Sequence, residues 1–327
     1  MENLIMSIPI LLVLSSVITG FSSKKLNNIS AGMISSMLVF ISLVFSLIIF
    51  YHSFNNDSSI LYDDFYQWIS INGLNIGMGY LIDKLSAMMM VVVLLISFVV
   101  HVYSIGYMRD EHDFKRFFSY IALFTFSMIL LVMSNNLIQL FIGWEGVGLV
   151  SYLLIGFFYK KESAIKANLK AFLINRIGDM FFIIGIIMIF GLLDSFDYRT
   201  MFSNLKLVDI NNIDHYYGFS YIDIACFFLF IGAMAKSAQI PLHVWLPDSM
   251  EGPTPVSALI HAATMVTAGI FMVARLSPIY SFAEVTTDFI LIIGALTALF
   301  IGVIAIFEND IKKVIAYSTI SQLGYMV

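Results

Sequence analysis

Long apolar runs dominate this sequence and limit the folds that it can adopt. A helix that crosses a bilayer needs about 20 predominantly apolar residues, because the hydrocarbon core is about 30 Å thick. A transmembrane barrel would instead show short strands of alternating apolar and polar residues. The apolar runs lie at 4–21, 29–51, 85–107, 117–134, 137–158, 164–193, 222–240, 256–276, 286–307 and 311–327.

The scarcity of charged residues agrees with these runs. Charged residues make up 12% of the chain and hydrophobic residues 60%, whereas soluble domains carry about 25% charged residues. We therefore predict an all-α polytopic membrane protein with about ten transmembrane helices. The first run has an acidic start and no basic region or cleavage site, so we interpret it as a retained helix rather than a signal peptide.

Two polar stretches, 52–84 and 194–221, are not apolar enough to span a membrane. The first combines aromatic and polar residues with an Asn-Gly pair, which indicates an extramembranous hairpin. No low-complexity tract or charge block divides the chain. We expect one membrane domain over 1–327, with three N-terminal helices in 1–107.

The basic residues predict the orientation of the helices. Loops on one side hold eleven lysines and arginines, loops on the other side hold four, and Arg176 and Lys236 lie within runs. Because short cytoplasmic loops are enriched in Lys and Arg, the N-terminus is expected on the outer side. The rich side has Lys24, Lys25, Arg109, Lys115, Arg116, Lys160, Lys161, Lys166, Lys170, Lys312 and Lys313, and the poor side has Lys84, Arg199, Lys206 and Arg275.

Other residue counts exclude several kinds of chemistry. One cysteine, Cys226, is too few for a disulfide framework, a zinc site or an iron–sulfur cluster. The net charge of -5 argues against nucleic acid as a partner. The chain has no Walker motif, no Gly-x-Gly-x-x-Gly turn after a strand and no histidine pair at haem-ligand spacing. We therefore expect no cofactor in this chain and no electron transfer through it.

Ionisable residues inside the apolar runs are the candidates for function, since each is costly unless it faces protein or water. Glu145 lies near the middle of the run 137–158, among glycines that would let another helix approach. Its alternative role is a neutral carboxyl hydrogen-bonded for packing. Arg176 and Asp179 are three residues apart and share a helix face, so they form either a self-neutralising ion pair or part of a relay.

Lys236 is the strongest candidate for a functional residue among them. It ends an apolar run, and four of the six prolines follow within 241–255. Proline breaks the helical ladder, and irregular backbone at membrane depth is tolerated only where it is buried or lines a cavity. This pattern predicts a broken helix near 236–250 with Lys236 at an ion site. The alternative is an interfacial lysine whose ammonium reaches the membrane surface.

Two further residues extend the candidate path. His261 lies in a run of small and hydroxylated residues and titrates near neutrality, which suits a relay, although a hydrogen-bonded core histidine is the alternative. Lys312 stands at the start of the last run and either points inward or, with Lys313, anchors the helix at the membrane surface. His101 and Cys226 are interpreted as packing residues or as residues with local hydrogen bonds.

Three segments resemble known proteins. The segment 235–269 is similar to the proton-channel core of antiporter-like membrane subunits from respiratory complex I, multi-subunit sodium/proton antiporters and membrane-bound hydrogenases. The segment 144–157, which begins Trp-Glu-Gly-Val-Gly, and the Asn-Arg-Ile-Gly-Asp segment at 175–179 more specifically resemble the subunit 5 family of NADH dehydrogenases. The resemblance runs from about residue 60 to the last residue.

This resemblance implies a fold of two inverted five-helix repeats, each with a broken helix. The first repeat would cover 117–276, and 286–327 would begin the second. Glu145 matches the carboxylate of the first repeat, Lys236 its broken-helix lysine and His261 the connecting relay residue. Lys312 matches the link to the second repeat, and Asp179 an acidic position that modulates the Glu–Lys pair.

The resemblance also implies proton translocation coupled to NADH:quinone oxidoreduction elsewhere in a complex that carries FMN, iron–sulfur clusters and ubiquinone. Expected partners are the neighbouring antiporter-like subunit (subunit 4), membrane lipids and a separate chain that supplies the second half. The alternatives are a sodium/proton antiporter subunit and a structural half-subunit that does not conduct. Heavy use of Phe, Ile, Asn, Tyr and Met favours a mitochondrial inner membrane over a bacterial plasma membrane.

Overall fold

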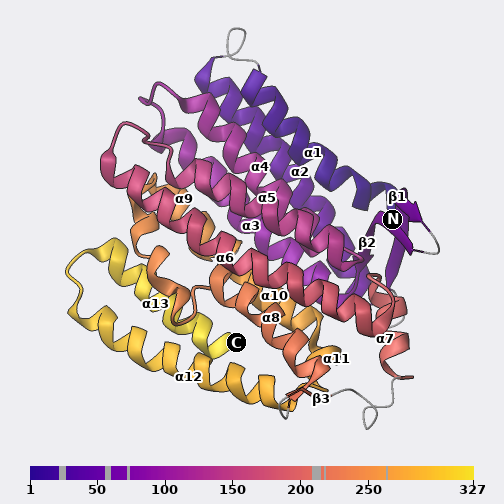
Figure 1. Cartoon of the computed structure of the whole chain (residues 1–327). Coiled ribbons are helices and arrows are strands. Elements are labelled where there is room, and N and C mark those ends of the chain that lie inside the picture. Colours follow the sequence, from indigo (N-terminus) through magenta and orange to yellow (C-terminus); the bar gives the residue numbers. More distant parts are fainter. Residues whose placement is uncertain (22–26, 56–59, 72–73, 208–214, 217–218, 263) are drawn as a thin grey trace.

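The computed structural model describes residues 1–21, 27–55, 60–71, 74–207, 215–216, 219–262 and 264–327. Lys24 and Lys25 therefore lie outside the described residues. Most of the described chain is helical (Figure 1). The long helices are α1 (Glu2–Phe21), α2 (Asn28–Asn55), α3 (Lys84–Tyr107), α4 (Phe114–Val132), α5 (Leu137–Ile155), α6 (Glu162–Leu193), α8 (Tyr221–Lys236), α12 (Glu284–Phe307) and α13 (Ile311–Met326).

Shorter elements connect these helices. Two antiparallel pairs of strands form, β1 with β2 and β3 with β4. The first pair lies in the stretch for which the sequence indicates a hairpin. The short elements are β1 (Leu61–Ile71), β2 (Leu74–Ile82), α7 (Tyr198–Leu205), β3 (His215–Tyr216), β4 (Phe219–Ser220), η2 (Leu242–Trp245), η3 (Asp248–Glu251), α9 (Thr254–Ala262), α10 (Met265–Arg275) and α11 (Ser277–Tyr280).

Among the described residues, eight segments are long and apolar enough to cross a membrane. The segment Thr254–Arg275, which contains α9 and α10, is one of them. The helices α8 and α13 have 16 residues each, short of a full span. The expectation of a helical membrane fold with about ten spans is therefore consistent with the structure.

Polar side chains set where several helices begin. Asp83 caps α3 by accepting from the Ser86 amide, and Asn136 caps α5 by accepting from the Gln139 amide. Ser220 and Asp223 form a capping box at the start of α8. Each cap satisfies amides that a helix leaves without partners in its first turn.

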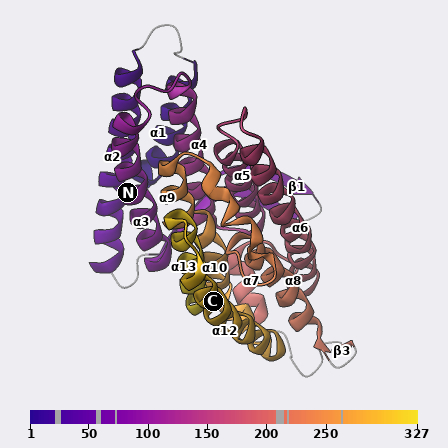
Figure 2. The same ribbon diagram turned by 90° about the vertical axis from the view of Figure 1, so that its left-hand side faces the viewer.

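The helices α9 and α10 lie in the middle of the helix bundle. Figure 2 shows α1, α2 and α3 on one side of the molecule and α6 and α8 on the other, with α9 and α10 between them. The helix α4 packs against α1 and α5, and α10 packs against α4, α5 and α8. The helices α12 and α13 pack mainly on each other, and α12 leaves large side chains such as Leu291 and Leu299 exposed.

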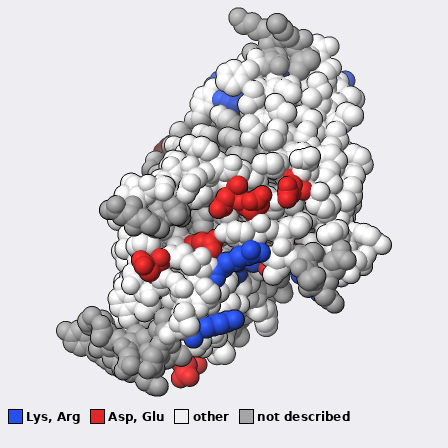
Figure 3. All heavy atoms as spheres, turned by 90° about the vertical axis from the view of Figure 1, so that its right-hand side faces the viewer, with Lys and Arg blue, Asp and Glu red and all other residues white. Residues whose placement is uncertain are grey.

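The loops gather at two ends. The described ends of α1 and α2 and the connections α3–α4, α5–α6 and α12–α13 line neighbouring cavities, so these segments share one end of the molecule. The hairpin, the α4–α5 turn and the α6–α7 turn line a cavity at the other end. Figure 3 shows acidic side chains gathered on the face where β1 and α7 lie, and acidic residues of these elements and their turns are Asp63, Asp64, Asp194 and Asp197.

Two predicted spans differ from the structure. The run 222–240 is helical only to Lys236, because the backbone then leaves the helix. The run 256–276 is not one helix but two, α9 and α10. At this second interruption the Thr264 hydroxyl donates to the Leu259 carbonyl at 2.5 Å, and the Ser237 hydroxyl donates to the Val266 carbonyl at 2.7 Å. Hydroxyl groups thus donate hydrogen bonds to carbonyl oxygens beside the interruption between α9 and α10.

Candidate functional site

Three helices bring four of the predicted residues together. Glu145 comes from α5, Arg176 and Asp179 from α6, and Lys236 from the last turn of α8. The helices α6 and α8 approach closely because Gly178 faces Ala235, and a Cβ atom at Gly178 would lie 2.3 Å from the Ala235 Cβ. Small residues allow such contacts between membrane helices.

The charged side chains pair between helices rather than along α6. Arg176 Nη1 lies 2.7 Å from Glu145 Oε1, while Asp179 faces Lys236. Of the two alternatives for Arg176 and Asp179, the self-neutralising ion pair between them does not form. Spacing of three residues places two side chains on neighbouring parts of a helix surface, but the long Arg176 side chain extends to α5 and Asp179 points into the protein.

Lys236 is completely buried at the centre of this cluster. Its Nζ atom lies 3.8 Å from Asp179 Oδ1, and it forms no hydrogen bond with any described residue. The ammonium also lies 5.6 Å from the centre of the Trp144 ring and against Gly148, where a Cβ atom would be 2.6 Å from Nζ. Full burial rules out a lysine that reaches the membrane surface.

Asp179 is the carboxylate closest to the ammonium, and a tryptophan holds it in place. The Trp144 Nε1–H donates to Asp179 Oδ1 at 2.7 Å. Trp144, which directly precedes Glu145, is not among the candidate residues predicted from the sequence. The signal was available, because a buried indole N–H usually has a hydrogen-bond partner.

The backbone after Lys236 confirms the broken helix. Ser237 ends α8, and Ala238 has a φ of 50°, a left-handed conformation that is uncommon for alanine. The 3-10 segments η2 and η3 follow in place of a helix. The Trp245 Nε1–H donates to the Ala235 carbonyl at 2.9 Å, which ties this irregular segment to the end of α8.

His261 lies near the end of α9, just before the second interruption. It is 6% exposed, and its Nε2 atom lies 3.3 Å from the Ser249 hydroxyl of η3. The Ser249 hydroxyl in turn donates to the Leu246 carbonyl at 2.6 Å. His261 therefore contacts the broken segment through Ser249 rather than the four-residue cluster directly.

Lys312 is not part of the cluster. It lies in the first turn of α13 and lines a cavity of about 600 Å³ with Lys161, Lys170 and Asp248 at the lysine-rich end. The helix α13 packs against α9 and η3. Lys312 thus lies on an element that adjoins the elements of His261 and Ser249.

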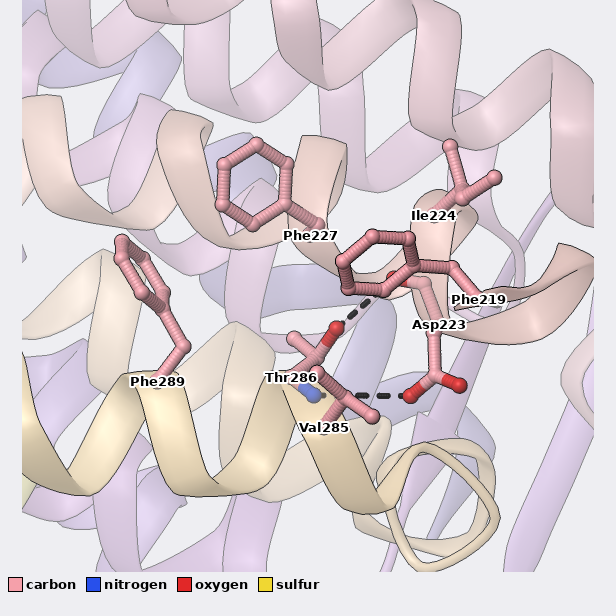
Figure 4. Close-up of a pocket in the computed structure, with 7 residues that line it drawn as sticks. All are labelled: Phe219, Asp223, Ile224, Phe227, Val285, Thr286 and Phe289. Carbon is pink, nitrogen blue, oxygen red and sulfur yellow. Dashed lines mark hydrogen bonds between the residues drawn. The ribbon is translucent and has the colours of Figure 1, made fainter. Parts of the chain in front are cut away.

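An apolar pocket between α8 and α12 lies apart from these residues (Figure 4). It has a volume of about 330 Å³ and is lined mainly by Phe219, Phe227, Val285 and Phe289. Its one carboxylate, on Asp223, already accepts from Ser220 and from the Thr286 amide. In the parts that the structure describes, no three histidine, cysteine or acidic side chains are grouped to hold a metal ion.

Two family models match the chain. Residues 134–327 match the transmembrane family of NADH:quinone oxidoreductases and Mrp antiporters. Residues 68–118 match the N-terminal family of chain 5 of NADH-ubiquinone oxidoreductase (complex I). The first match contains all six candidate residues, from Glu145 to Lys312.

Curated relatives match nearly the whole length of this chain. The chain is 53% identical over 315 residues to NADH-quinone oxidoreductase subunit L of Neisseria meningitidis, covering 95% of this chain and 47% of that protein. It is 46% identical over 325 residues to NADH-ubiquinone oxidoreductase chain 5 of Phytophthora infestans, covering 99% of this chain and 49% of that protein. The chain thus spans about half the length of the curated relatives it matches.

Solved structures share the fold. A chain of the Mrp complex from Dietzia sp. superposes with a TM-score of 0.84 at 24% identity, covering 99% of this chain and 33% of that chain. A chain of the archaeal membrane-bound sulfane sulfur reductase superposes with a TM-score of 0.83 at 18% identity, covering 98% and 63%. These likenesses confirm the antiporter-like fold.

Proposed function

The chain belongs to the membrane family of NADH:quinone oxidoreductases and Mrp antiporters, and from this premise we propose that it translocates protons in the membrane arm of complex I. Quinone reduction by NADH would take place in other subunits, which would hold the FMN, the iron–sulfur clusters and the ubiquinone. No cofactor is assigned to this chain. The observation that carries the proposal is the fully buried Lys236 ammonium, 3.8 Å from the Asp179 carboxylate.

An ion pair of this kind can switch the proton affinity of a lysine. Two unit charges 3.8 Å apart attract each other by about 4 kcal/mol at an effective dielectric constant near 20. Opening or closing the pair would therefore change the proton affinity of Lys236 by about three orders of magnitude. Moving one charge against a membrane potential costs about 2.3 kcal/mol per 100 mV, which a change of this size exceeds.

Glu145 and Arg176 are proposed to connect this switch to a neighbouring subunit. Their ion pair lies near the middle of two spans, yet the Arg176 side chain is 46% exposed and the Glu145 side chain 25%. A charged pair exposed at membrane depth is costly unless protein or water covers it. We therefore assign this face to the contact with the adjacent antiporter-like subunit (subunit 4).

The second part of the proposed path leaves the cluster through His261 and Lys312. Ser249 connects His261 to the broken segment, and α13 places Lys312 beside the same elements. In this proposal 117–276 forms one five-helix repeat and 286–327 begins a second. The remaining part of the second repeat would pack against the exposed apolar side chains of α12 and α13.

The membrane is assigned from composition and relatives. The chain is multi-pass, and similar proteins occur in Neisseria meningitidis and in Phytophthora infestans. The richness in Phe, Ile, Asn and Tyr favours the mitochondrial inner membrane over a bacterial plasma membrane.

The test replaces Lys236 with alanine in the assembled complex and measures protons pumped per NADH oxidised in sealed vesicles. We expect Lys236→Ala to lower this ratio, because no buried ammonium would remain to carry the proton. The matched control is Lys206→Ala, at the exposed end of α7. Full pumping by an assembled Lys236→Ala complex would overturn the proposal.

A sodium/proton antiporter subunit is the second candidate, favoured by the match to a family that includes Mrp antiporters and by the shared fold with an Mrp complex. Purification under native conditions separates the two. Recovery with flavin and iron–sulfur subunits supports complex I, whereas recovery with antiporter subunits alone supports the second candidate.

A further inference from the structure

The Trp144 indole and the Lys236 ammonium face the same oxygen atom. Trp144 Nε1 lies 2.7 Å from Asp179 Oδ1, and Lys236 Nζ lies 3.8 Å from that oxygen. The first distance is that of a strong hydrogen bond, whereas the second is longer than a charge-assisted hydrogen bond. The indole therefore occupies the position on Asp179 Oδ1 that a close ammonium would otherwise take.

The surroundings keep the indole in this position. Trp144 is fully buried, and its ring packs against the Phe182 ring with centroids 4.7 Å apart. Gly148, one turn further along α5, leaves the space that the Lys236 ammonium fills. Glu145 follows Trp144 at about 100° around the helix and pairs with Arg176 instead.

We propose that Trp144 is a positioning residue for the proton transfer, and that it acts by holding Asp179 so that the Lys236 ion pair stays long and easily opened. This inference rests on the proposed function of the chain. The proton carrier remains Lys236, and Trp144 neither gains nor loses a proton. Its N–H determines how tightly the carboxylate and the ammonium bind each other.

The direction of the effect follows from the charges around Lys236. The groups that act on its ammonium are Asp179 and Arg176 from α6 and Glu145 from α5. Without the indole N–H, the freed Asp179 oxygen can approach the ammonium to hydrogen-bonding distance. Shortening the distance between Lys236 Nζ and Asp179 Oδ1 from 3.8 Å to about 2.8 Å strengthens their attraction. At an effective dielectric constant near 20, this raises the proton affinity of Lys236 roughly tenfold. The lysine then releases its proton only at higher pH.

The experiment measures proton pumping by the assembled complex in sealed vesicles as a function of pH. We expect Trp144→Phe to move the pH of half-maximal pumping upward by about one unit. The control is Trp68→Phe, because Trp68 lies on β1, is 50% exposed and has no part in the cluster. This control should leave the pH of half-maximal pumping in place.

A second variant separates the hydrogen bond from the packing of the ring. Site-specific replacement of Trp144 by benzothienylalanine puts sulfur in place of the N–H and keeps the shape of the side chain. This variant therefore also tests the hydrogen bond if the Trp144→Phe complex does not assemble. The same upward shift supports the proposal. An unshifted profile in the benzothienylalanine variant, or an equal shift in Trp68→Phe, would overturn it. If Lys236→Ala pumps normally, the proposed function itself fails; if Lys236→Ala loses pumping and the profile stays unshifted, only the role of Trp144 fails.

Discussion

Arg176 and Glu145 form an ion pair 2.7 Å long between α6 and α5, so Asp179 is the carboxylate that faces Lys236. The two acidic residues therefore have different surroundings. Asp179 is 3% exposed and receives the Trp144 N–H, whereas Glu145 lies at a partly exposed face beside an arginine. In the proposed mechanism, Asp179 therefore acts on the lysine directly and Glu145 acts from the edge of the cluster.

Asp179→Asn is expected to impair pumping more than Glu145→Gln does. Removing the Asp179 charge leaves the buried ammonium without its closest carboxylate, and breaking a buried pair costs about 3–5 kcal/mol. Loss of the Glu145 charge frees Arg176, whose exposed side chain can turn to other partners. Proton pumping per NADH oxidised in vesicles would check the order. Equal losses, or a greater loss in Glu145→Gln, would contradict it.

Gly148→Ala is expected to disturb the site without changing any charge. A Cβ atom at residue 148 would lie 2.6 Å from Lys236 Nζ, so the ammonium must move. Because Nζ is the end of a flexible side chain, the change should move the ammonium more than it destabilises the fold. We expect reduced pumping in an assembled complex. Gly106→Ala is the control, because no atom lies within 4 Å of the added Cβ there; similar pumping in both variants would argue against the contact.

Ser249→Ala is expected to reduce pumping if His261 takes part in the path. The Ser249 hydroxyl is the one described side-chain partner of the His261 ring, at 3.3 Å from Nε2. Removing it leaves a buried imidazole without that contact, at a cost of about 1–3 kcal/mol. Ser203→Ala serves as the control, since Ser203 is exposed and donates only to the Thr200 carbonyl. Identical pumping in the two variants would remove Ser249 from the path.

Arg275 and Asp83 are expected to stabilise the contact between α10 and the start of α3. Arg275 donates to both Asp83 oxygens, at 2.7 and 3.0 Å, and to the Ser86 hydroxyl at 2.5 Å. The Arg275 side chain is only 6% exposed. Arg275→Ala should therefore lower the melting temperature of the purified complex, because the partly buried Asp83 carboxylate would lose charge-assisted hydrogen bonds that contribute about 1.5–3 kcal/mol each.

This pair also predicts a pH dependence of stability. Burial raises the pKa of Asp83, but hydrogen bonds from Arg275 and Ser86 outweigh burial, and the pKa lies below its usual value. A lowered folded-state pKa stabilises the protein fully above the unfolded-state value of about 3.9, and this stabilisation is lost as the pH falls below it. Melting temperatures of the unmodified complex and of Asp83→Asn should therefore converge as the pH falls below about 4. A constant difference down to low pH would contradict the pairing.

The membrane helices and the broken segment were predictable because local sequence determines them. Runs of about 20 apolar residues are required by the thickness of the bilayer, and the prolines from Pro241 to Pro255 cannot continue a helix. The interruption between α9 and α10 was not predicted, because no proline or glycine marks it in the sequence. The Ser237 and Thr264 hydroxyls donate hydrogen bonds to backbone carbonyls there.

The identities of the ionisable residues in the cluster follow from the sequence, whereas their pairing does not. A charged residue in an apolar run is costly wherever it lies, so Glu145, Arg176, Asp179 and Lys236 stand out without a structure. Spacing along one helix left open whether Arg176 pairs with Asp179 or whether both belong to a relay. Only the packing of α5, α6 and α8 decides that Arg176 pairs with Glu145 and that Trp144 and Lys236 share one oxygen of Asp179, because these contacts join side chains whose positions in the sequence carry no information about distance.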